Sequence, residues 1–333
     1  GSVWIDKKRA NFRLAEAVKK CGIISEPSPV ELLKAVKNPV EIKNIRYAHL
    51  LDGIAVTKFM YWIKTNVGKI KINEADAADY IDSLRREVGG EHFIAPSFDT
   101  ISAYNANAAM MHYSADSKNC AVLEPKGILL VDSGGHYFEG TTDITRTFAL
   151  GEVSDVVRYH FTLTVRAMLN LAAARFMHGC RGENLDILAR GIMWENGLDY
   201  RCGTGHGVGY LLSVHEGPNS FRHKLSEDRA MSAVLDEGMI TTDEPGIYVE
   251  GSHGIRIENE LLCKNAEKCE YGQIMEFETI TYAPIDLDCI DTALFETRDR
   301  ERLNAYHKMV YEKLSPYFEG EELEFLKNCT RAI

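Results

Sequence analysis

The spacing of apolar residues along the chain predicts five amphipathic helices. The first begins after Asn38, which is a suitable N-cap, and a proline and the capping-box acid Glu41 follow it. Apolar side chains then recur every three or four residues, which predicts one long helix over 39–65. Similar patterns, ended by glycine or proline, predict helices over 73–89, 154–177, 183–196 and 298–314.

Short segments rich in β-branched residues lie between these helices and predict strands, because glycine or proline bounds most of them. We find no internal repeat, no low-complexity stretch and no linker between residues 38 and 300. A single domain of the α+β class is therefore the economical interpretation. The predicted strands cover 119–125, 127–135, 143–150, 238–249 and 254–262.

Composition narrows the possible partners. The 333 residues carry 38 basic and 49 acidic side chains, a formal net charge of −11, and no long basic block, so nucleic acid is not expected as a partner. The longest apolar runs, such as 127–131, have the length of a strand, and a membrane helix needs about 20 residues. We therefore expect no membrane partner.

The cysteines and the N-terminus indicate a cytoplasmic protein. Eight cysteines are scattered without any C-x-x-C pair, which is typical of reduced thiols. The opening GSVWIDKKRANF lacks the apolar run of a signal peptide, and Gly1 and Ser2 resemble an expression scar. We expect a cytoplasmic protein of which this chain is a fragment.

Two acids lie near the ends of neighbouring predicted strands. Asp132 ends one strand and Asp143 lies in the next, with a turn expected at 133–135, so the two carboxylates would face each other across a hairpin. For either acid alone, a turn residue or a hydrogen-bonded strand end is the simpler interpretation. Only the residues that surround these two acids can distinguish a structural role from a functional one.

Two further acids lie in the segments TTDEPG and GIRIENELL. Glu244 ends the first segment just before a proline, where the chain must leave the strand ladder. The period of two in the second segment places Arg256 and Glu258 on one face and two isoleucines on the other. A solvated face with an ordinary salt bridge is the alternative for this pair.

The segment GTGHGVGYLLSVHEGP, residues 203–218, holds two histidines among several glycines. Each glycine costs a helix interior roughly 1 kcal/mol relative to alanine, so the segment favours turns and close backbone approach. Loop histidines that make hydrogen bonds are the alternative for His206 and His215. A functional role requires partners elsewhere in the chain.

Carboxylates and one imidazole at strand ends and glycine-rich turns provide those partners. Two divalent ions, with a summed charge of +4, would neutralise four ionised acids that otherwise repel one another. Ligation by mostly oxygen with one histidine favours manganese or a similar hard ion over a thiolate-type zinc site. The proposed ligands are Asp132, Asp143, His206, Glu244 and Glu258.

The motifs VDSG, TTDITRT, GTGHGVG, TDEPG and GIRIEN resemble those of dinuclear metallopeptidases of pita-bread fold, and among them the aminopeptidase P family. The resemblance covers about 28–291, most of the chain. It implies a curved, mostly antiparallel sheet covered by helices. It also implies a lead-in helix or domain remnant over 1–37, a catalytic domain over 38–290 and a helical C-terminal extension over 291–333 packed on it.

The resemblance implies an enzyme that removes the N-terminal residue from peptides with proline in second position. The five ligands would hold two divalent ions, manganese first and zinc or cobalt as alternatives, and a hydroxide bridging them would attack the scissile carbonyl. Glu244 would also act as general base and proton shuttle. Relatives lead us to expect a homodimer.

The same resemblance assigns residues that contact the substrate. His112 and His215 match histidines that hold the substrate carbonyl and stabilise the oxyanion, which gives them a catalytic role. Tyr248 and Arg256 match positions on the proline side of the bond; core packing and an ion pair to a ligand carboxylate are their alternatives. Cys202 stands where close relatives usually carry histidine, so one substrate-contacting imidazole is missing.

Two other functions fit the same scaffold. A dipeptidase specific for Xaa-Pro would cleave Gly-Pro but no Xaa-Pro-Xaa tripeptide. A non-catalytic pita-bread domain would bind peptides or histone-like partners, and such domains lose metal ligands. All five ligand positions keep ligating residue types here, which favours an enzyme.

Overall fold

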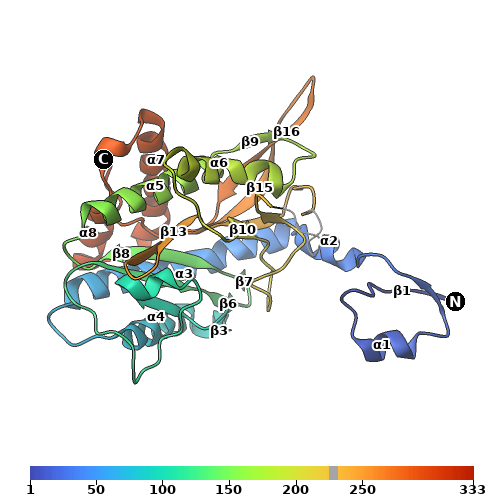
Figure 1. The fold of residues 1–333 in the computed structure, drawn as a ribbon, viewed down its shortest axis with the longest axis horizontal. Helices are drawn as coiled ribbons and strands as arrows, with labels where there is room; N and C mark the ends of the chain where they lie inside the picture. Colours follow the sequence, from blue (N-terminus) through green and yellow to red (C-terminus); the bar gives the residue numbers. More distant parts are fainter. Residues whose placement is uncertain (225–231) are drawn as a thin grey trace.

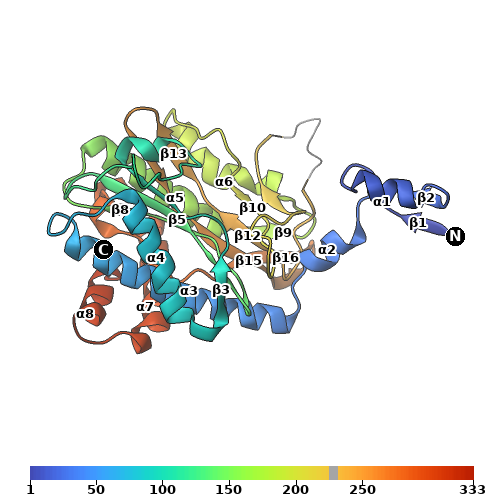
Figure 2. The ribbon, with the colours of Figure 1, turned by 90° about the horizontal axis from the view of Figure 1, so that it is seen from below.

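Two pairs of helices pack against a set of antiparallel sheets in the computed structural model, which describes residues 1–224 and 232–333. Helices α3 (Pro39–Asn66) and α4 (Glu74–Gly89) form one pair, and α5 (Asp155–Ala172) and α6 (Gly182–Glu195) form the other. Figure 1 shows the N-terminal segment projecting from this body, on the side away from the C-terminus, and Figure 2 shows the same arm from below.

Capping fixes where the first pair of helices begins. The side chain of Asn38 accepts hydrogen bonds from the backbone N–H groups of Val40 and Glu41, and the Glu41 carboxylate accepts one from the N–H of Asn38. Asn73 and Asp76 form the same reciprocal box at the start of α4. The remaining helices are α1 (Phe12–Ala17), α2 (Pro29–Ala35), α7 (Thr297–Leu314) and α8 (Gly320–Cys329), with short 3₁₀ turns such as η2 (Asn105–Ala109).

The strands pair antiparallel, except for β1 (Ser2–Trp4) and β2 (Gly22–Ile24), which run parallel. The largest sheet among the described residues has the order β12-β15-β16-β9, and two three-stranded sheets have the orders β4-β5-β8 and β3-β6-β7. Two-stranded sheets join β10 with β11 and β13 with β14. Their bounds are β3 (Phe93–Pro96), β4 (Ile101–Tyr104), β5 (Ile128–Ser133), β6 (Gly135–Tyr137), β7 (Gly140–Thr141), β8 (Ile144–Ala149), β9 (Arg175–Met177), β10 (Gly205–His206), β11 (Ser220–Phe221), β12 (Ile240–Asp243), β13 (Gly246–Val249), β14 (His253–Arg256), β15 (Asn259–Cys269) and β16 (Gly272–Thr279).

The core lies between the helix pairs and the sheets. Phe59 of α3 and Ile81 of α4 are buried with Phe148 of β8, and Leu163 of α5 is buried with Leu261 of β15. Each such side chain contributes about 1.5–3 kcal/mol through burial. The helices thus anchor the backs of the sheets and hold the strand ends, which carry the polar residues, in fixed positions.

The five predicted helices are confirmed, with one change at an end. The helix predicted over 154–177 ends at Ala172, and residues 175–177 form β9 instead. Pairing with β16 decides this, because Phe176 and its neighbours complete the edge of the largest sheet and lie opposite Met275. The helical spacing of apolar residues carries no information about this contact with β16, which is distant in sequence.

Four predictions about strands and turns are wrong. The predicted strand over 238–249 is two strands, β12 and β13, which belong to different sheets. Residues 119–125 form a loop in which Val122 makes a single isolated bridge to Asn73. In place of the predicted turn at 133–135, the chain enters β6, which pairs with both β3 and β7, and β6 and β7 lie between β5 and β8 in sequence. The predicted strand over 254–262 is two strands, β14 and β15, which belong to different sheets.

The two ends of the chain differ in their packing. Helix α7 packs on α3 and α5, and α8 packs on α3. Residues 1–37 form two short helices and the β1–β2 pair in place of one lead-in helix. The boundaries at 37 and 290 stay a prediction. Among the described residues, no helix combines the length and apolarity that a membrane span requires.

Candidate active site

One cavity of about 310 Å³ collects all ten of the site residues that the sequence predicted. They come from the ends of β5 and β8, the loop after η2, the glycine-rich segment, and the strand junctions β12–β13 and β14–β15. The cavity is lined by Phe98, Ile101, Met111, His112, Asp132, Asp143, Cys202, His206, His215, Glu244, Tyr248, Arg256 and Glu258.

Three lining residues were not predicted. Met111 lies beside the predicted His112, whereas no predicted site residue lies in the sequence next to Phe98 and Ile101. All three side chains are apolar, so a search for ligating or titratable residues has no reason to select them. The feature that could have identified them is closeness to Asp132. Strand pairing shows this for Ile101, which lies opposite Asp132 across β4 and β5.

The pairing of β5 with β8 positions the first two acids. Asp132 lies opposite Thr145, and Asp143 comes just before β8 begins. The backbone N–H of Asp143 donates to the buried Glu260 carboxylate at 2.8 Å, which fixes the chain at this point. Pairing of β5 with β8 thus brings Asp132 and Asp143 to the same place, as expected. The connection between these strands is longer than the predicted turn, because it contains β6 and β7.

The glycines of the segment 203–218 permit close backbone contacts. A Cβ at Gly205 would lie 1.8 Å from the carbonyl oxygen of Thr242, and one at Gly207 would lie 2.1 Å from that of Glu216. Only glycine allows these approaches, which place β10 beside β12. The backbone N–H of His206 then donates to Oγ1 of Thr242 at 3.0 Å.

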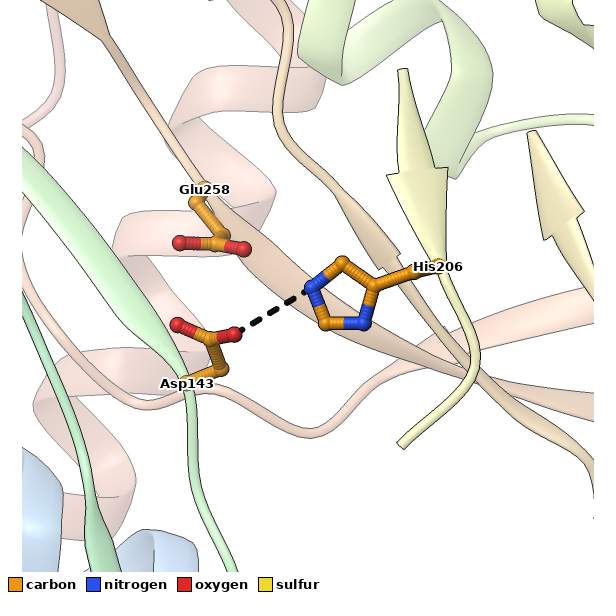
Figure 3. A group of neighbouring side chains, drawn as sticks. All are labelled: Asp143, His206 and Glu258. Atoms are coloured by element: carbon orange, nitrogen blue, oxygen red, sulfur yellow. Dashed lines mark ion pairs between the residues drawn. The ribbon is translucent and has the colours of Figure 1, made fainter. Parts of the chain in front are cut away.

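The ring of His206 has a defined orientation toward the acids. Its Nδ1 donates to the carbonyl oxygen of Gly207 at 3.0 Å, so the neutral ring presents a lone pair at Nε2. Nε2 lies 3.4 Å from Oδ2 of Asp143 and 3.5 Å from Oε1 of Glu244. Figure 3 shows His206 and Glu258 converging on Asp143 from separate elements. Lone pairs that face one another in this way suit a cation between them.

The charges of the cluster support the same conclusion. One ligand atom each of Asp143, His206 and Glu258 lies within 4.8 Å of the others, and Oδ1 of Asp132 is buried without a hydrogen-bond partner. Burial, and then the neighbouring carboxylates, raise the pKa of Asp143 and of Glu258 well above the ordinary value. The donor set therefore fits divalent cations, which would offset both effects.

Threonines hold two of the acids in place. Thr145 donates to Oε2 of Glu258 at 2.6 Å, and Thr242 donates to Oε1 of Glu244 at 2.9 Å. Each threonine donates to one oxygen of its carboxylate, so this hydrogen bond does not use the second oxygen. Such supporting hydrogen bonds orient carboxylates for ligation.

Arg256 and Tyr248 form one wall of the cavity. Arg256 is buried and forms an ion pair with Asp132, and its Nη1 donates to the Tyr248 hydroxyl at 2.8 Å. The alternative interpretation of Arg256, an ion pair with a ligand carboxylate, is therefore present in the structure. Burial raises the pKa of Tyr248, so its hydroxyl stays protonated.

His215 and Cys202 lie beside the acid cluster. The ring of His215 contacts that of His206, with centroids 4.2 Å apart, and burial followed by His206 lowers its pKa. Burial, followed by Glu244, raises the pKa of Cys202 to about 11, so the thiol is neutral near pH 7. The cavity thus places a neutral imidazole and a neutral thiol near the proposed ligands.

Residues 43–265 match the family model of metallopeptidase family M24, and residues 273–333 match that of the C-terminal region of peptidase_M24. The chain belongs to metallopeptidase family M24. Its pita-bread fold, with helices covering antiparallel sheets, is the expected one.

Curated relatives of this M24 chain are named as forms of aminopeptidase P. It is 40% identical over 340 residues to a probable Xaa-Pro aminopeptidase P of Tuber melanosporum, covering 100% of this chain and 54% of that protein. It is 37% identical over 355 residues to Aminopeptidase P1 of Arabidopsis thaliana, with 99% and 54% covered. The chain spans about half the length of the curated relatives it matches.

Solved structures resemble the M24 chain as well. The X-prolyl aminopeptidase of Caenorhabditis elegans, described as a cytosolic enzyme with a di-nuclear active site, superimposes with a TM-score of 0.87 at 33% identity, covering 94% of this chain and 51% of that one. A Xaa-Pro dipeptidase of Bacillus anthracis superimposes with a TM-score of 0.69 at 27% identity, covering 86% and 74%.

Proposed function

We propose that this M24 chain is the catalytic part of a metal-dependent aminopeptidase that removes the N-terminal residue from peptides with proline in second position. The observation that carries the proposal is the convergence of five ligating side chains in one cavity that also holds His112 and His215. Relatives named Xaa-Pro aminopeptidase P support the choice of substrate.

Two divalent ions complete this proposal, and manganese is the first choice because four carboxylates and one imidazole form a hard, oxygen-rich donor set. The residues that would hold them are Asp132, Asp143, His206, Glu244 and Glu258. When bound, the ions supply Lewis acidity toward the scissile carbonyl and lower the pKa of water enough for attack near neutral pH.

The remaining steps belong to the chain's own residues. His215 stays neutral near pH 7 because its pKa is lowered, so it can donate a hydrogen bond to the developing oxyanion, and His112 donates from the opposite loop. Glu244 receives the proton from the attacking water and delivers it to the leaving nitrogen. Xaa-Pro bonds lack an N–H, so recognition rests on shape and on the wall formed by Tyr248 and Arg256.

We also propose a cytoplasmic location and free peptides as substrates. The eight cysteines are all free thiols, and the Caenorhabditis elegans enzyme is described as cytosolic. The homodimer stays a prediction.

The proposal is tested by loading the chain with manganese, measuring its metal content and following three peptides. We expect release of arginine from Arg-Pro-Pro and no cleavage of Gly-Pro or Met-Ala-Ser, with Glu244→Gln as the inactive control. Cleavage of Gly-Pro alone would favour a dipeptidase, a function supported by the likeness to the Bacillus anthracis enzyme. Tight binding of Arg-Pro-Pro without turnover would favour a peptide-binding module.

A further inference from the structure

Glu74, the first residue of α4, is a fully buried carboxylate outside the cavity. In the described part of the chain no Lys or Arg forms an ion pair with it, although burying a charge without a partner is costly. Its carboxylate is stabilised by hydrogen bonds and by its place at the positive N-terminal end of α4. The donors are the backbone N–H of Tyr104 at 2.6 Å, Nδ2 of Asn107 at 2.9 Å, the hydroxyl of Tyr113 at 2.7 Å and the backbone N–H of Ala121 at 2.8 Å.

These four donors all belong to one stretch of chain, residues 104–121. Tyr104 ends β4, Ala121 lies at the other end of the stretch, and Asn107 and Tyr113 lie between them. The backbone N–H of Glu74 also donates to the carbonyl oxygen of Ala121 at 3.1 Å. One carboxylate therefore closes the stretch at both of its ends and holds its middle.

His112 is the neighbour of Tyr113 in this stretch and lines the cavity with an exposed side chain. The start of the stretch is fixed against β14, because a Cβ at Gly254 would lie 1.8 Å from the carbonyl oxygen of Ala108. Beyond Ala108, the Tyr113 hydroxyl is the side-chain contact that reaches the buried carboxylate. Opening the loop there would remove a hydrogen-bond donor from a buried carboxylate, which is unfavourable because the acceptor would be left unsatisfied away from water.

We propose that Glu74, acting through Tyr113, is a positioning residue that holds His112 in the cavity that contains the proposed metal ligands. Its kinetic consequence rests on the proposed function, since His112 acts as an oxyanion donor there. Misplacing such a donor lowers turnover more than substrate binding, because the contact strengthens in the transition state.

The test removes a single hydrogen bond with Tyr113→Phe in the manganese-loaded chain. We expect kcat on Arg-Pro-Pro to fall about 10-fold while KM stays within about 2-fold. The matched control is Tyr61→Phe, because the Tyr61 hydroxyl also donates to a glutamate, Glu321 at 3.0 Å, but neither residue lines the cavity. The control should keep the parental kcat, and equal losses in both variants would overturn the proposal.

A double-mutant cycle separates positioning from general weakening. If Glu74 and Tyr113 act through His112, Tyr113→Phe should cause no further loss in a His112→Ala background. Full additivity of the two losses would overturn the proposal. Glu74→Gln removes part of the acceptor set and should give a larger loss than Tyr113→Phe, with the same dependence on His112.

Histidine NMR gives a readout that needs no turnover. In protein labelled at histidine Cε1, the His112 signal, assigned with His112→Ala, should shift or broaden in Tyr113→Phe and in Glu74→Gln, while the His206 signal stays in place. An unmoved His112 signal in both variants would overturn the positioning role even if the chain proves inactive on every peptide. Failure of the proposed function alone would leave this shift intact.

Discussion

Asp52 and Asp143 are buried carboxylates in neighbouring parts of the fold, and they are satisfied in opposite ways. Asp52 accepts hydrogen bonds from Arg85 at 2.5 Å, from the Tyr137 hydroxyl at 3.1 Å and from Thr142 at 2.7 Å. Asp143, the next residue after Thr142, faces other carboxylates in the cavity. Asp52 is thus paired with a guanidinium, whereas Asp143 forms no ion pair with a Lys or Arg of residues 1–224 and 232–333, and the nearby Arg256 pairs with Asp132 instead.

The difference shows how a structural acid can be distinguished from a ligand. Thr142 and Asp143 are adjacent residues between β7 and β8, and their side chains have different partners. One side chain joins the Asp52–Arg85 pair, and the other enters the cavity. An acid whose partners are all in the protein stabilises the fold, whereas an acid surrounded by acids either holds a proton or is neutralised by an added cation.

Removing divalent cations should change activity and stability more than any substitution below. The change should come from Asp143 and the other acids of the cavity. Chelation should abolish peptidase activity and lower the melting temperature, because the carboxylates then repel one another without compensation. Manganese should restore both. Melting curves and peptide assays before and after chelation check this, and full activity with an unchanged melting temperature would contradict the dinuclear centre.

Breaking the buried ion pair between Asp52 and Arg85 should lower the stability of the fold. Arg85→Met leaves Asp52 buried without its cation, and we expect a loss of about 3–5 kcal/mol in the free energy of unfolding. The matched control is Arg46→Met, since the ion pair of Arg46 with Glu278 is partly exposed and should contribute at most about 1 kcal/mol. Urea unfolding of metal-loaded protein measures both, and equal losses would contradict the contrast.

Removing an oxyanion donor should affect catalysis without affecting the fold. His112→Ala should lower kcat/KM about 10²-fold or more, as loss of such a donor typically does. Its exposed side chain leaves little packing to lose, so the melting temperature should stay close to the parental value. A loss of activity that parallels a loss of metal would instead show that His112 supports ligation.

The acids of the cavity should make stability depend on pH in one direction. The folded pKa of Asp143 and of Glu258 is raised, so their contribution to stability is present below the unfolded pKa of about 4 and is lost as pH rises through the folded value. In chelated protein this loss should be visible, and cations should cancel it. The gap between the melting temperatures of loaded and chelated protein should therefore widen from pH 5 to pH 8, and a constant gap would argue against clustered acids.

Cys202 should give the smallest effect. Its thiol is neutral and a weak donor, so Cys202→His should change kcat/KM only modestly if His112 and His215 already serve the oxyanion. If Cys202 is only a packing residue, the variant should lose melting temperature while the folded fraction keeps its activity. A folded Cys202→His protein that is as inactive as His112→Ala would show that this position was misinterpreted.

The helices and the residue types that line the cavity could be predicted from the amino-acid sequence. Caps at Asn38 and Asn73 and the 3.6-residue period depend on local contacts, so they can be recognised from the residues alone. The five proposed ligands were recognised in the same way, because their residue types and motif spacing carry the resemblance to M24 proteins. All five lie in the cavity.

The pairing of the strands, and which buried acids lie beside an arginine, became known only from the folded arrangement. The strand β9, the β6–β7 insertion and the division of 254–262 into two strands all depend on partners distant in sequence. The same holds for Glu74, whose four donors lie 30 to 47 residues away in sequence. A carboxylate's role depends on what surrounds it after folding, because neutralisation by Arg85, by hydrogen bonds or by added cations requires contacts that no local pattern records.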